Sequence, residues 1–188
     1  MRASTGPTKI LLSTAAGCGL AIGIYPRFSY DARGGGGIGQ LGAVNANGRQ
    51  ELDFPAASLV IPPLNWRTTR VLGLPLPPGL SIDIGANQLA GSFEPATGHL
   101  QLRFLARFCF RLGGLYRAPD LLVDTVLNSD SATGQRHQAS GQPLDAGGQA
   151  LLVGVATVPP SGDGWLDRFL GLPDEALAML RCTFTPLP

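Results

Sequence analysis

The segment from His99 to Leu112 alternates between apolar and polar residues with a period of two. Successive side chains of a β-strand point to opposite sides, so this pattern predicts one long strand with two different faces. The predicted outer face carries Arg103, Arg107 and Arg111. A long strand with one apolar face needs a sheet and a core around it, which favours a β-rich fold. The predicted core face consists of Leu100, Leu102, Phe104, Ala106, Phe108, Phe110 and Leu112.

The composition supports the same fold class. Charged residues make up only 14% of the 188 residues, and the chain contains 26 glycines and 16 prolines. Soluble domains usually carry about 25% charged residues, so long solvent-facing helices are not expected. Glycine and proline favour many short strands joined by tight turns. We therefore expect a single soluble β-rich domain over residues 1–188, with an all-β fold that is either a two-sheet β-sandwich or a flattened barrel of hairpins.

Four turns share an Asx or acidic residue followed by a glycine, at 45–49, 94–99, 130–135 and 145–149. Glycine adopts a positive φ without strain, and Asn or Asp can bond its own backbone, so this combination is typical of hairpin turns. Strands are predicted between these turns and along the rest of the chain, at 9–15, 20–30, 57–61, 68–73, 79–84, 88–94, 99–112, 121–129, 149–158 and 180–185.

Only the region at about 163–181 has a helical pattern. Asp163 is placed to cap a first helix whose apolar residues between Trp165 and Leu170 fall on one side, and Gly171 can end it. A second helix is predicted from Asp174 to Leu180, because Pro173 and the two acidic residues after it suit a helix N-terminus. We expect these short C-terminal helices to close one end of the β core, either as a plain cap or as a lid over a cavity.

The best candidate site is the segment from Tyr25 to Gly37. Tyrosine and arginine are enriched at binding hot spots, and the backbone amides of a glycine tract can approach an anion closely. The alternative interpretation is a strand end followed by a mobile loop. A second candidate surface is the arginine face of the long strand, which either docks an acidic partner or is simply solvated. The predicted binding residues are Tyr25, Arg27, Tyr30, Asp31, Arg33, Gly34, Gly35, Gly36 and Gly37.

No pattern predicts a cofactor, a metal site or a catalytic residue. Residues 37–42 match G-x-G-x-x-G, but no strand directly precedes them and no helix follows, so nucleotide binding is not expected. His99 and His137 lack acidic or cysteine neighbours at ligand spacing, and no G-x-S-x-G elbow is present. The net charge of +1 gives no attraction to nucleic acid.

Cys18, Cys109 and Cys182 are odd in number and widely spaced, which favours free buried thiols in a reducing compartment. One disulfide with a spare cysteine is the alternative. An apolar stretch at 10–24 resembles a signal peptide, and the residues before Cys18 resemble a lipoprotein processing site, but the stretch is short and interrupted by Ser13 and Thr14. We expect a cytoplasmic protein without a transmembrane segment, and a lipoprotein or secreted form is the alternative.

These observations favour a non-catalytic binding or assembly protein that docks a macromolecule, either a protein partner or a second copy. The alternative is a carrier of an apolar ligand such as a lipid or pigment, and the third hypothesis is a hydrolase or isomerase without a recognisable motif. A large apolar cavity would favour the carrier, whereas a filled core with an exposed aromatic patch would favour docking. Because both aromatic side chains are assigned to the core, replacing Phe104 or Phe108 by alanine should cost about 3–5 kcal/mol.

Overall fold

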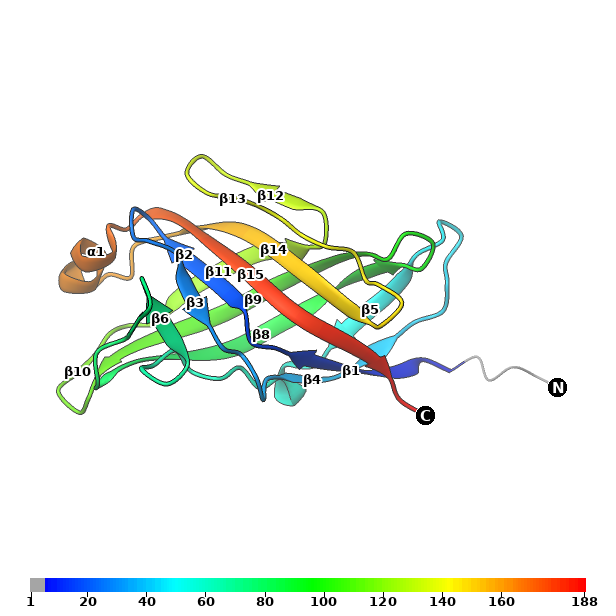
Figure 1. The fold of residues 1–188 in the computed structure, drawn as a ribbon, viewed down its shortest axis with the longest axis horizontal. Helices are drawn as coiled ribbons and strands as arrows, with labels where there is room; N and C mark the ends of the chain where they lie inside the picture. The colour runs from blue at the N-terminus through cyan, green and yellow to red at the C-terminus, as the bar shows by residue number, and fades with distance from the viewer. Residues whose placement is uncertain (1–5) are drawn as a thin grey trace.

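The computed structural model describes residues 6–188, so residues 1–5 of the predicted domain lie outside the described residues. The fold is all-β with one short α-helix, as the sequence predicts (Figure 1). No helix in the described chain is long and apolar enough to cross a membrane. The elements are β1 Thr8–Thr14, β2 Cys18–Ile22, β3 Phe28–Tyr30, β4 Gly36–Leu41, β5 Gln50–Phe54, the 3-10 helix η1 Ala56–Ser58, β6 Thr69–Val71, β7 Leu74–Pro75, β8 Leu80–Glu94, β9 His99–Leu112, β10 Tyr116–Arg117, β11 Leu121–Asn128, β12 Ser131–Thr133, β13 Gln138–Ser140, β14 Gln149–Val158, α1 Gly164–Leu170 and β15 Asp174–Pro186.

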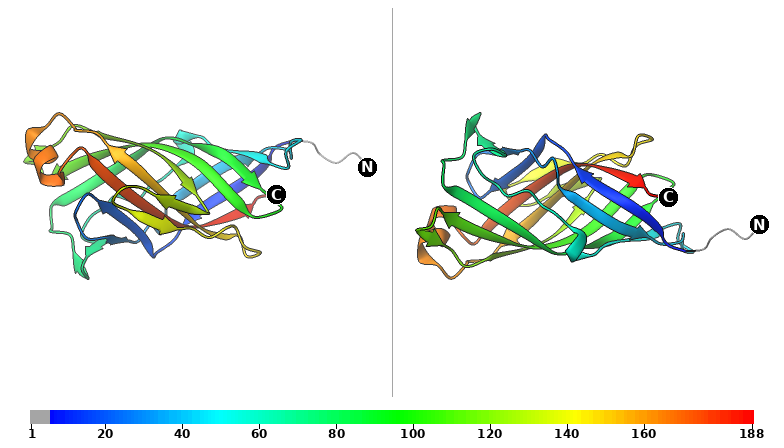
Figure 2. Two further views of the ribbon diagram at one scale, coloured as in Figure 1. Left: turned by 90° about the horizontal axis from the view of Figure 1, so that it is seen from above. Right: turned by 90° about the horizontal axis from the view of Figure 1, so that it is seen from below.

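One large antiparallel sheet curls round into a partial ring of eight strands, which is not a regular barrel (Figure 2). The strands follow one another in the order β1, β4, β5, β8, β9, β11, β14 and β15, and β15 pairs again with β1. The ring is closed along β1 near the C-terminus, where residues 182–186 of β15 pair with residues 10–14. Towards α1 it opens, because residues 176–179 of β15 pair instead with β2, which leads to β3, β6 and β7.

The long strand β9 covers the predicted residues and has the two predicted faces, except that Leu112 of the predicted core face is 36% exposed. Leu100 and Leu102 are fully buried, whereas Arg103 and Arg107 are exposed. β8 pairs with β9 over nearly its whole length, with one bulge between Ala86 and Gln88. The main core lies inside the closed part of the ring, where buried side chains from seven strands pack together. Its fully buried members include Leu52, Phe54, Leu100, Leu102, Leu152 and Cys182.

The first C-terminal helix is confirmed together with both of its caps. The Asp163 carboxylate accepts hydrogen bonds from the backbone N–H groups of Trp165 and Leu166, and these bonds lower the pKa of that carboxyl. Gly171 ends the helix in the left-handed conformation, with φ of 71°. Leu166 and Leu170 face inward and pack against β9, β11 and β14, so α1 covers the open end of the ring.

The predicted second helix is wrong, because residues 174–180 belong to β15. This strand has hydrogen-bonding neighbours on both sides, β14 along residues 174–183 and then β2 and β1 on the other edge. A two-sided ladder outweighs the weak local preference for helix over these few residues. The strand predicted at 57–61 is also wrong: residues 56–58 form η1, and Val60 makes only an isolated bridge to Gly36.

The β12–β13 hairpin lies outside the ring and is attached to the start of β15. The Glu175 carboxylate accepts hydrogen bonds from the backbone N–H groups of Gln135, Arg136 and His137, at 2.8, 3.0 and 2.6 Å. Burial raises the pKa of Glu175, but these N–H donors outweigh it, so the pKa lies below its ordinary value of 4.5. The carboxylate therefore anchors the hairpin loop only while it is ionised.

We expect this anchor to fail in acid. Because the folded-state pKa of Glu175 is lowered, its contribution is complete above pH 4.5 and is lost as the pH falls through the lower folded-state value. Hydrogen exchange of the amides at 135–137, corrected for the intrinsic pH dependence, should therefore accelerate as the pH falls below 4.5. Glu175→Gln should show the fast exchange already at neutral pH. Unchanged protection in that variant would contradict the anchor.

Candidate functional site

A cavity of about 350 Å³ lies inside the open part of the ring, beneath α1. Its walls come from β2, β3 and β6 of the branch and from β8, β9, β11, β14 and β15 of the ring. A smaller chamber of about 110 Å³ continues it towards β1 and β4, and the two share Leu20, Phe104, Phe108 and Ala178 as lining residues. The larger cavity is lined mainly by Leu20, Ile22, Phe28, Leu64, Val71, Leu76, Ile82, Phe104, Phe108, Phe110, Leu121, Val123, Gly154, Ala156, Phe169, Ala176 and Ala178.

The hollow follows from small residues facing large ones across the ring. β14 contributes Gly154 and Ala156 to the lining, and β15 contributes Ala176 and Ala178. β9 on the opposite wall contributes phenylalanines, which fill only part of the space. Gly154 also lets β14 approach β11 closely, because a Cβ there would lie 2.8 Å from the Val126 carbonyl oxygen. The period-two alternation of each strand determines which residues face inward. The small inward side chains of β14 and β15 leave the cavity unfilled, because the phenylalanines of β9 do not occupy all of the space.

The polar atoms that line the two chambers are bonded to the protein itself. Thr125 Oγ1 donates to the Val155 carbonyl at 2.9 Å. The Tyr25 and Tyr30 hydroxyls donate to the carbonyls of Phe169 and Pro62. No Asp, Glu, Lys, Arg or His side chain is among the described lining residues. A charged molecule would therefore lose its hydration without gaining a partner, so the cavity fits an apolar molecule.

The three cysteines are buried, and none forms a disulfide within the described chain. Cys18 lines the smaller chamber, where burial raises the pKa of its thiol despite a hydrogen bond from the Arg181 backbone N–H. Burial raises the pKa of Cys182 to about 12. Both thiols are therefore protonated at neutral pH and act as small apolar groups in the core.

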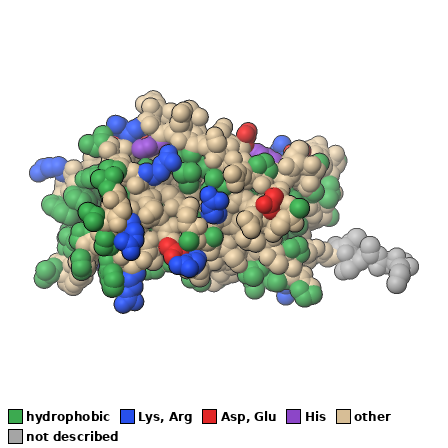
Figure 3. Space-filling view, in the orientation of Figure 1, with side chains coloured by type: hydrophobic (Ala, Val, Ile, Leu, Met, Phe, Trp, Pro, Cys, Tyr) green, Lys and Arg blue, Asp and Glu red, His purple; other side chains and the backbone are tan. Residues whose placement is uncertain are grey.

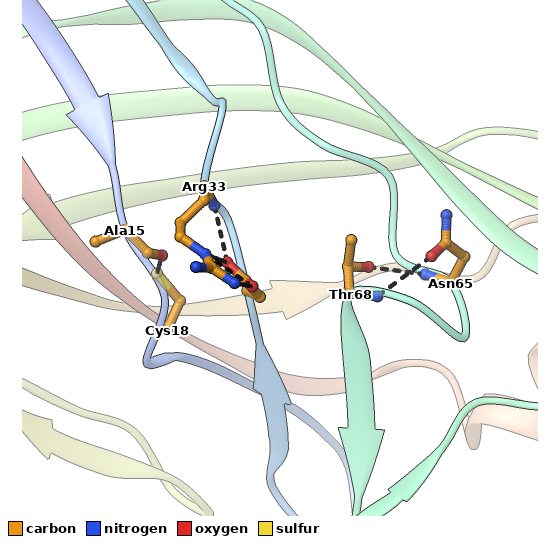
Figure 4. A network of polar contacts seen from close by, with 6 residues as sticks. Ala15, Cys18, Arg33, Asn65 and Thr68 are labelled. Carbon is orange, nitrogen blue, oxygen red and sulfur yellow. Dashed lines mark hydrogen bonds and ion pairs between the residues drawn. The ribbon is translucent and has the colours of Figure 1, made fainter.

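The structure divides the predicted Tyr25–Gly37 site into an inner and an outer part. Tyr25 lines the larger cavity and Tyr30 the smaller chamber, so both tyrosines point inward. Arg27 and Arg33 are exposed. The Arg33 guanidinium turns back onto the Asp31 carboxylate at 2.6 Å, beside the Cys18 turn (Figure 4). This ion pair lowers the pKa of Asp31, and its exposure limits its worth to stability.

The glycine tract differs from the expected loose loop, because Gly36 and Gly37 begin β4 and pair with β1. A Cβ on Gly36 would lie 1.8 Å from the Leu12 carbonyl oxygen, and one on Gly37 would lie 2.6 Å from the Ser58 carbonyl oxygen. Within the tract, only a Cβ on Gly34 would have no atom within 4 Å. Close backbone packing thus explains why side chains are missing here. Binding of a partner by this segment stays a prediction.

The arginine face of β9 is solvated, and two of its three arginines are ion-paired. Arg103 contacts Asp124 at 2.8 Å and lowers the pKa of that carboxyl. Arg111 pairs with Asp83, whereas Arg107 is exposed and makes no ion pair with any described residue. The arginines therefore lie on the outer face as predicted. Their use by an acidic partner stays a prediction.

The described residues contain no cluster of three or more potential metal ligands. His99 Nδ1 lies 3.3 Å from the Ser129 hydroxyl, which is fully buried and also accepts a hydrogen bond from the Leu100 backbone N–H. Burial keeps this hydroxyl away from any molecule in solution. The residues that sequence reasoning missed are the small inward-facing ones on β14 and β15. Their only signal is a run of Gly and Ala within apolar strands.

A comparison of the chain with protein-family models, with curated proteins and with solved structures finds no match.

Proposed function

We propose that this protein binds an uncharged, apolar small molecule in the cavity beneath α1. The observation that carries the proposal is an apolar cavity of about 350 Å³ whose polar lining atoms are all bonded within the protein. Protein cores are packed to nearly crystalline density, and voids larger than a water molecule are few. Small-molecule sites are typically apolar hollows of about 300–1,000 Å³. An occupant would also recover the packing energy that an empty cavity loses.

The lining also sets the class of ligand. Aromatic rings of Phe104, Phe108 and Phe110 form one wall, and the methyl groups of Ala156 and Ala178 form the other. Such walls suit a hydrocarbon chain or a flat polyene or ring system. A carboxylate or phosphate buried in this cavity would have no cation to pair with among the described lining residues. We therefore propose that any polar end of the ligand stays at the opening.

The test is a titration with N-phenyl-1-naphthylamine, an uncharged dye that fluoresces in apolar surroundings. We expect one dye molecule to bind per chain, and Ala178→Phe to weaken binding at least about tenfold, because the new ring occupies the space between both chambers. Leu122→Phe is the matched control, since Leu122 is 55% exposed on the outer face of β11. It should bind the dye like the wild type.

Equal dye affinity in Ala178→Phe and the wild type would exclude the cavity as the binding site. Native mass spectrometry of protein purified from its own host then identifies the occupant by its mass. Docking of a macromolecular partner through Arg27 and Arg33 remains the second proposal, supported by their exposure. A pull-down with both arginines replaced should lose the partner without lowering the melting temperature.

A further inference from the structure

The cavity reaches the surface between α1 and the β6–β7 hairpin. Phe169 and Pro77 line the cavity and are also exposed, Phe169 by 43%. β2, β3, β6 and β7 form a branch of the sheet that ends at β7. Between this branch and β8, the described residues form one isolated bridge, which joins Leu64 to Ile82. The ring therefore has a mouth at this end of the molecule, opposite the C-terminus (Figures 1 and 2).

The mouth is surrounded by apolar side chains that point into solvent. Four large apolar residues of the described chain are more than 70% exposed: Ile24, Leu72, Leu74 and Leu115. They lie in or beside the β2–β3, β6–β7 and β9–β10 turns, which all lie at the α1 end (Figures 1 and 2). Trp165 and Phe169 of α1 stack with ring centroids 5.1 Å apart and are half exposed beside them. Figure 3 shows apolar side chains gathered at this end. We call these six residues the apolar rim.

Leu72 is unusual in its backbone as well as in its exposure. It has φ of 52° and is the only described non-glycine residue with a positive φ. It forms with Gly73, whose φ is 81°, the two-residue turn between the paired residues Val71 and Leu74. Turns with two positive φ values strongly favour Asn before Gly. A leucine here is both strained and 80% exposed, which is typical of a residue kept for a contact rather than for folding.

Positive charge accompanies the rim. Arg27, Arg70 and Arg168 are exposed, and none forms an ion pair with any described residue. The two acidic residues at α1 are hydrogen-bonded within the protein: Asp163 caps the helix, and Asp167 accepts hydrogen bonds from Ser161. The rim therefore combines apolar tips, a half-exposed tryptophan and unpaired guanidinium groups. This combination complements an interface of acyl chains beneath anionic headgroups.

We propose that the apolar rim docks onto the surface of an anionic phospholipid bilayer, so that the cavity mouth faces the acyl region. The leucine tips and Trp165 enter the headgroup boundary, and Arg27, Arg70 and Arg168 contact lipid phosphates. This placement gives an apolar ligand a path between bilayer and cavity that avoids water. The inference rests on the proposed function, because the path needs the cavity as its end point.

The experiment is flotation with vesicles made of equal parts of phosphatidylcholine and phosphatidylglycerol, compared with phosphatidylcholine alone. We expect the wild type to float with the anionic vesicles and less with the neutral ones. The rim variant Leu72→Asn/Leu115→Ser should lose at least about tenfold in partitioning, since burying one leucine is worth about that factor or more. Asn suits the Leu72 turn, so this variant should fold. The control variant Val44→Ser/Val126→Ser removes exposed apolar side chains away from the rim and should float like the wild type.

Three results would overturn the docking. The first is a wild type that stays at the bottom of the gradient with both vesicles, and the second is a rim variant that floats as well as the wild type. The third is a wild type that forms a dimer and does not float, together with a rim variant that is a monomer. Dye titration without vesicles separates this inference from the proposed function. A rim variant that binds the dye normally but no longer floats supports docking through the rim. A wild type that floats but binds no dye would contradict the proposed path of a ligand from the bilayer to the cavity. Docking of the apolar rim onto the bilayer would still be supported.

Discussion

Gly36→Ala is expected to prevent folding. Gly36 has φ of 122°, a conformation that L side chains rarely adopt, and it pairs with Ser13 in β1. An added Cβ would lie 1.8 Å from the Leu12 carbonyl oxygen and 2.7 Å from the Leu12 carbonyl carbon. Both atoms are backbone, so relief requires β4 to move away from β1 and the ring to open. The cost should exceed about 4 kcal/mol, a large part of the total stability of a small domain.

The matched control is Gly42→Ala, just beyond the other end of the same strand. A Cβ there would meet only ordinary contacts at 3.6–3.7 Å, and Gly42 has no positive φ. We expect Gly42→Ala to keep the far-UV circular dichroism and melting temperature of the wild type, and Gly36→Ala to lose the cooperative transition. If Gly36→Ala instead melted within a few degrees of the wild type, close packing would not explain the glycine tract. Binding would then be its better explanation.

Local patterns predicted the strands that are long and regular in the structure. Residues 99–112 and 149–158 are strands over the predicted ranges, because each alternates or is apolar over ten or more residues. The helix at α1 was predictable from Asp163 and Gly171, whose caps act within one turn of the chain. In each case, the decisive interaction involves residues that are close in sequence or a period that repeats many times.

The errors lie where a distant strand decides the local structure. Residues 174–180 have a local helical pattern, but β14 and β2 offer hydrogen bonds on both edges. The glycines of β4 have poor strand preference, yet distant segments approach so closely that only glycine fits: β1 at Gly36, η1 at Gly37 and β5 at Gly39. None of these neighbours is visible from the segment itself. In both segments the sequence does not predict the strand, because the chain that stabilises it lies far away in the sequence.

The candidate site was only partly predictable. Alternation on β9 showed that Phe104 and Phe108 point inward, but not whether the opposite wall would fill the space in front of them. That depends on the volumes of Gly154, Ala156 and Ala178, which belong to strands more than 40 residues further along the chain. An apolar ligand was among the sequence hypotheses, whereas the position of its cavity required the paired strands and their register.

Phe54→Ala should cost about 3–5 kcal/mol, and Phe108→Ala should cost only about 1–2 kcal/mol. This revises the larger cost expected for Phe108 from the sequence. Phe54 is 1% exposed in the main core, and its ring lies 6.2 Å from that of Phe184. Its truncation would leave a new void in closely packed surroundings. Phe108 already borders the cavity, so its side chain has fewer neighbours to lose.

Urea unfolding, monitored by circular dichroism, measures the free energy of unfolding that each variant loses. Adding N-phenyl-1-naphthylamine then shows which of the two losses comes from the cavity. A ligand that binds only the folded state adds stability according to its concentration and affinity. Saturating dye should also stabilise the wild type, so each variant is compared with the wild type at the same dye concentration. Phe108→Ala enlarges the cavity, so the dye should remove most of its difference from the wild type. The cavity is intact in Phe54→Ala, because its new void lies in the closed part of the ring. The dye should therefore stabilise this variant and the wild type equally and leave their difference unchanged. Equal costs for the two variants, without any rescue by the dye, would mean that the space in front of Phe108 is filled by the protein itself.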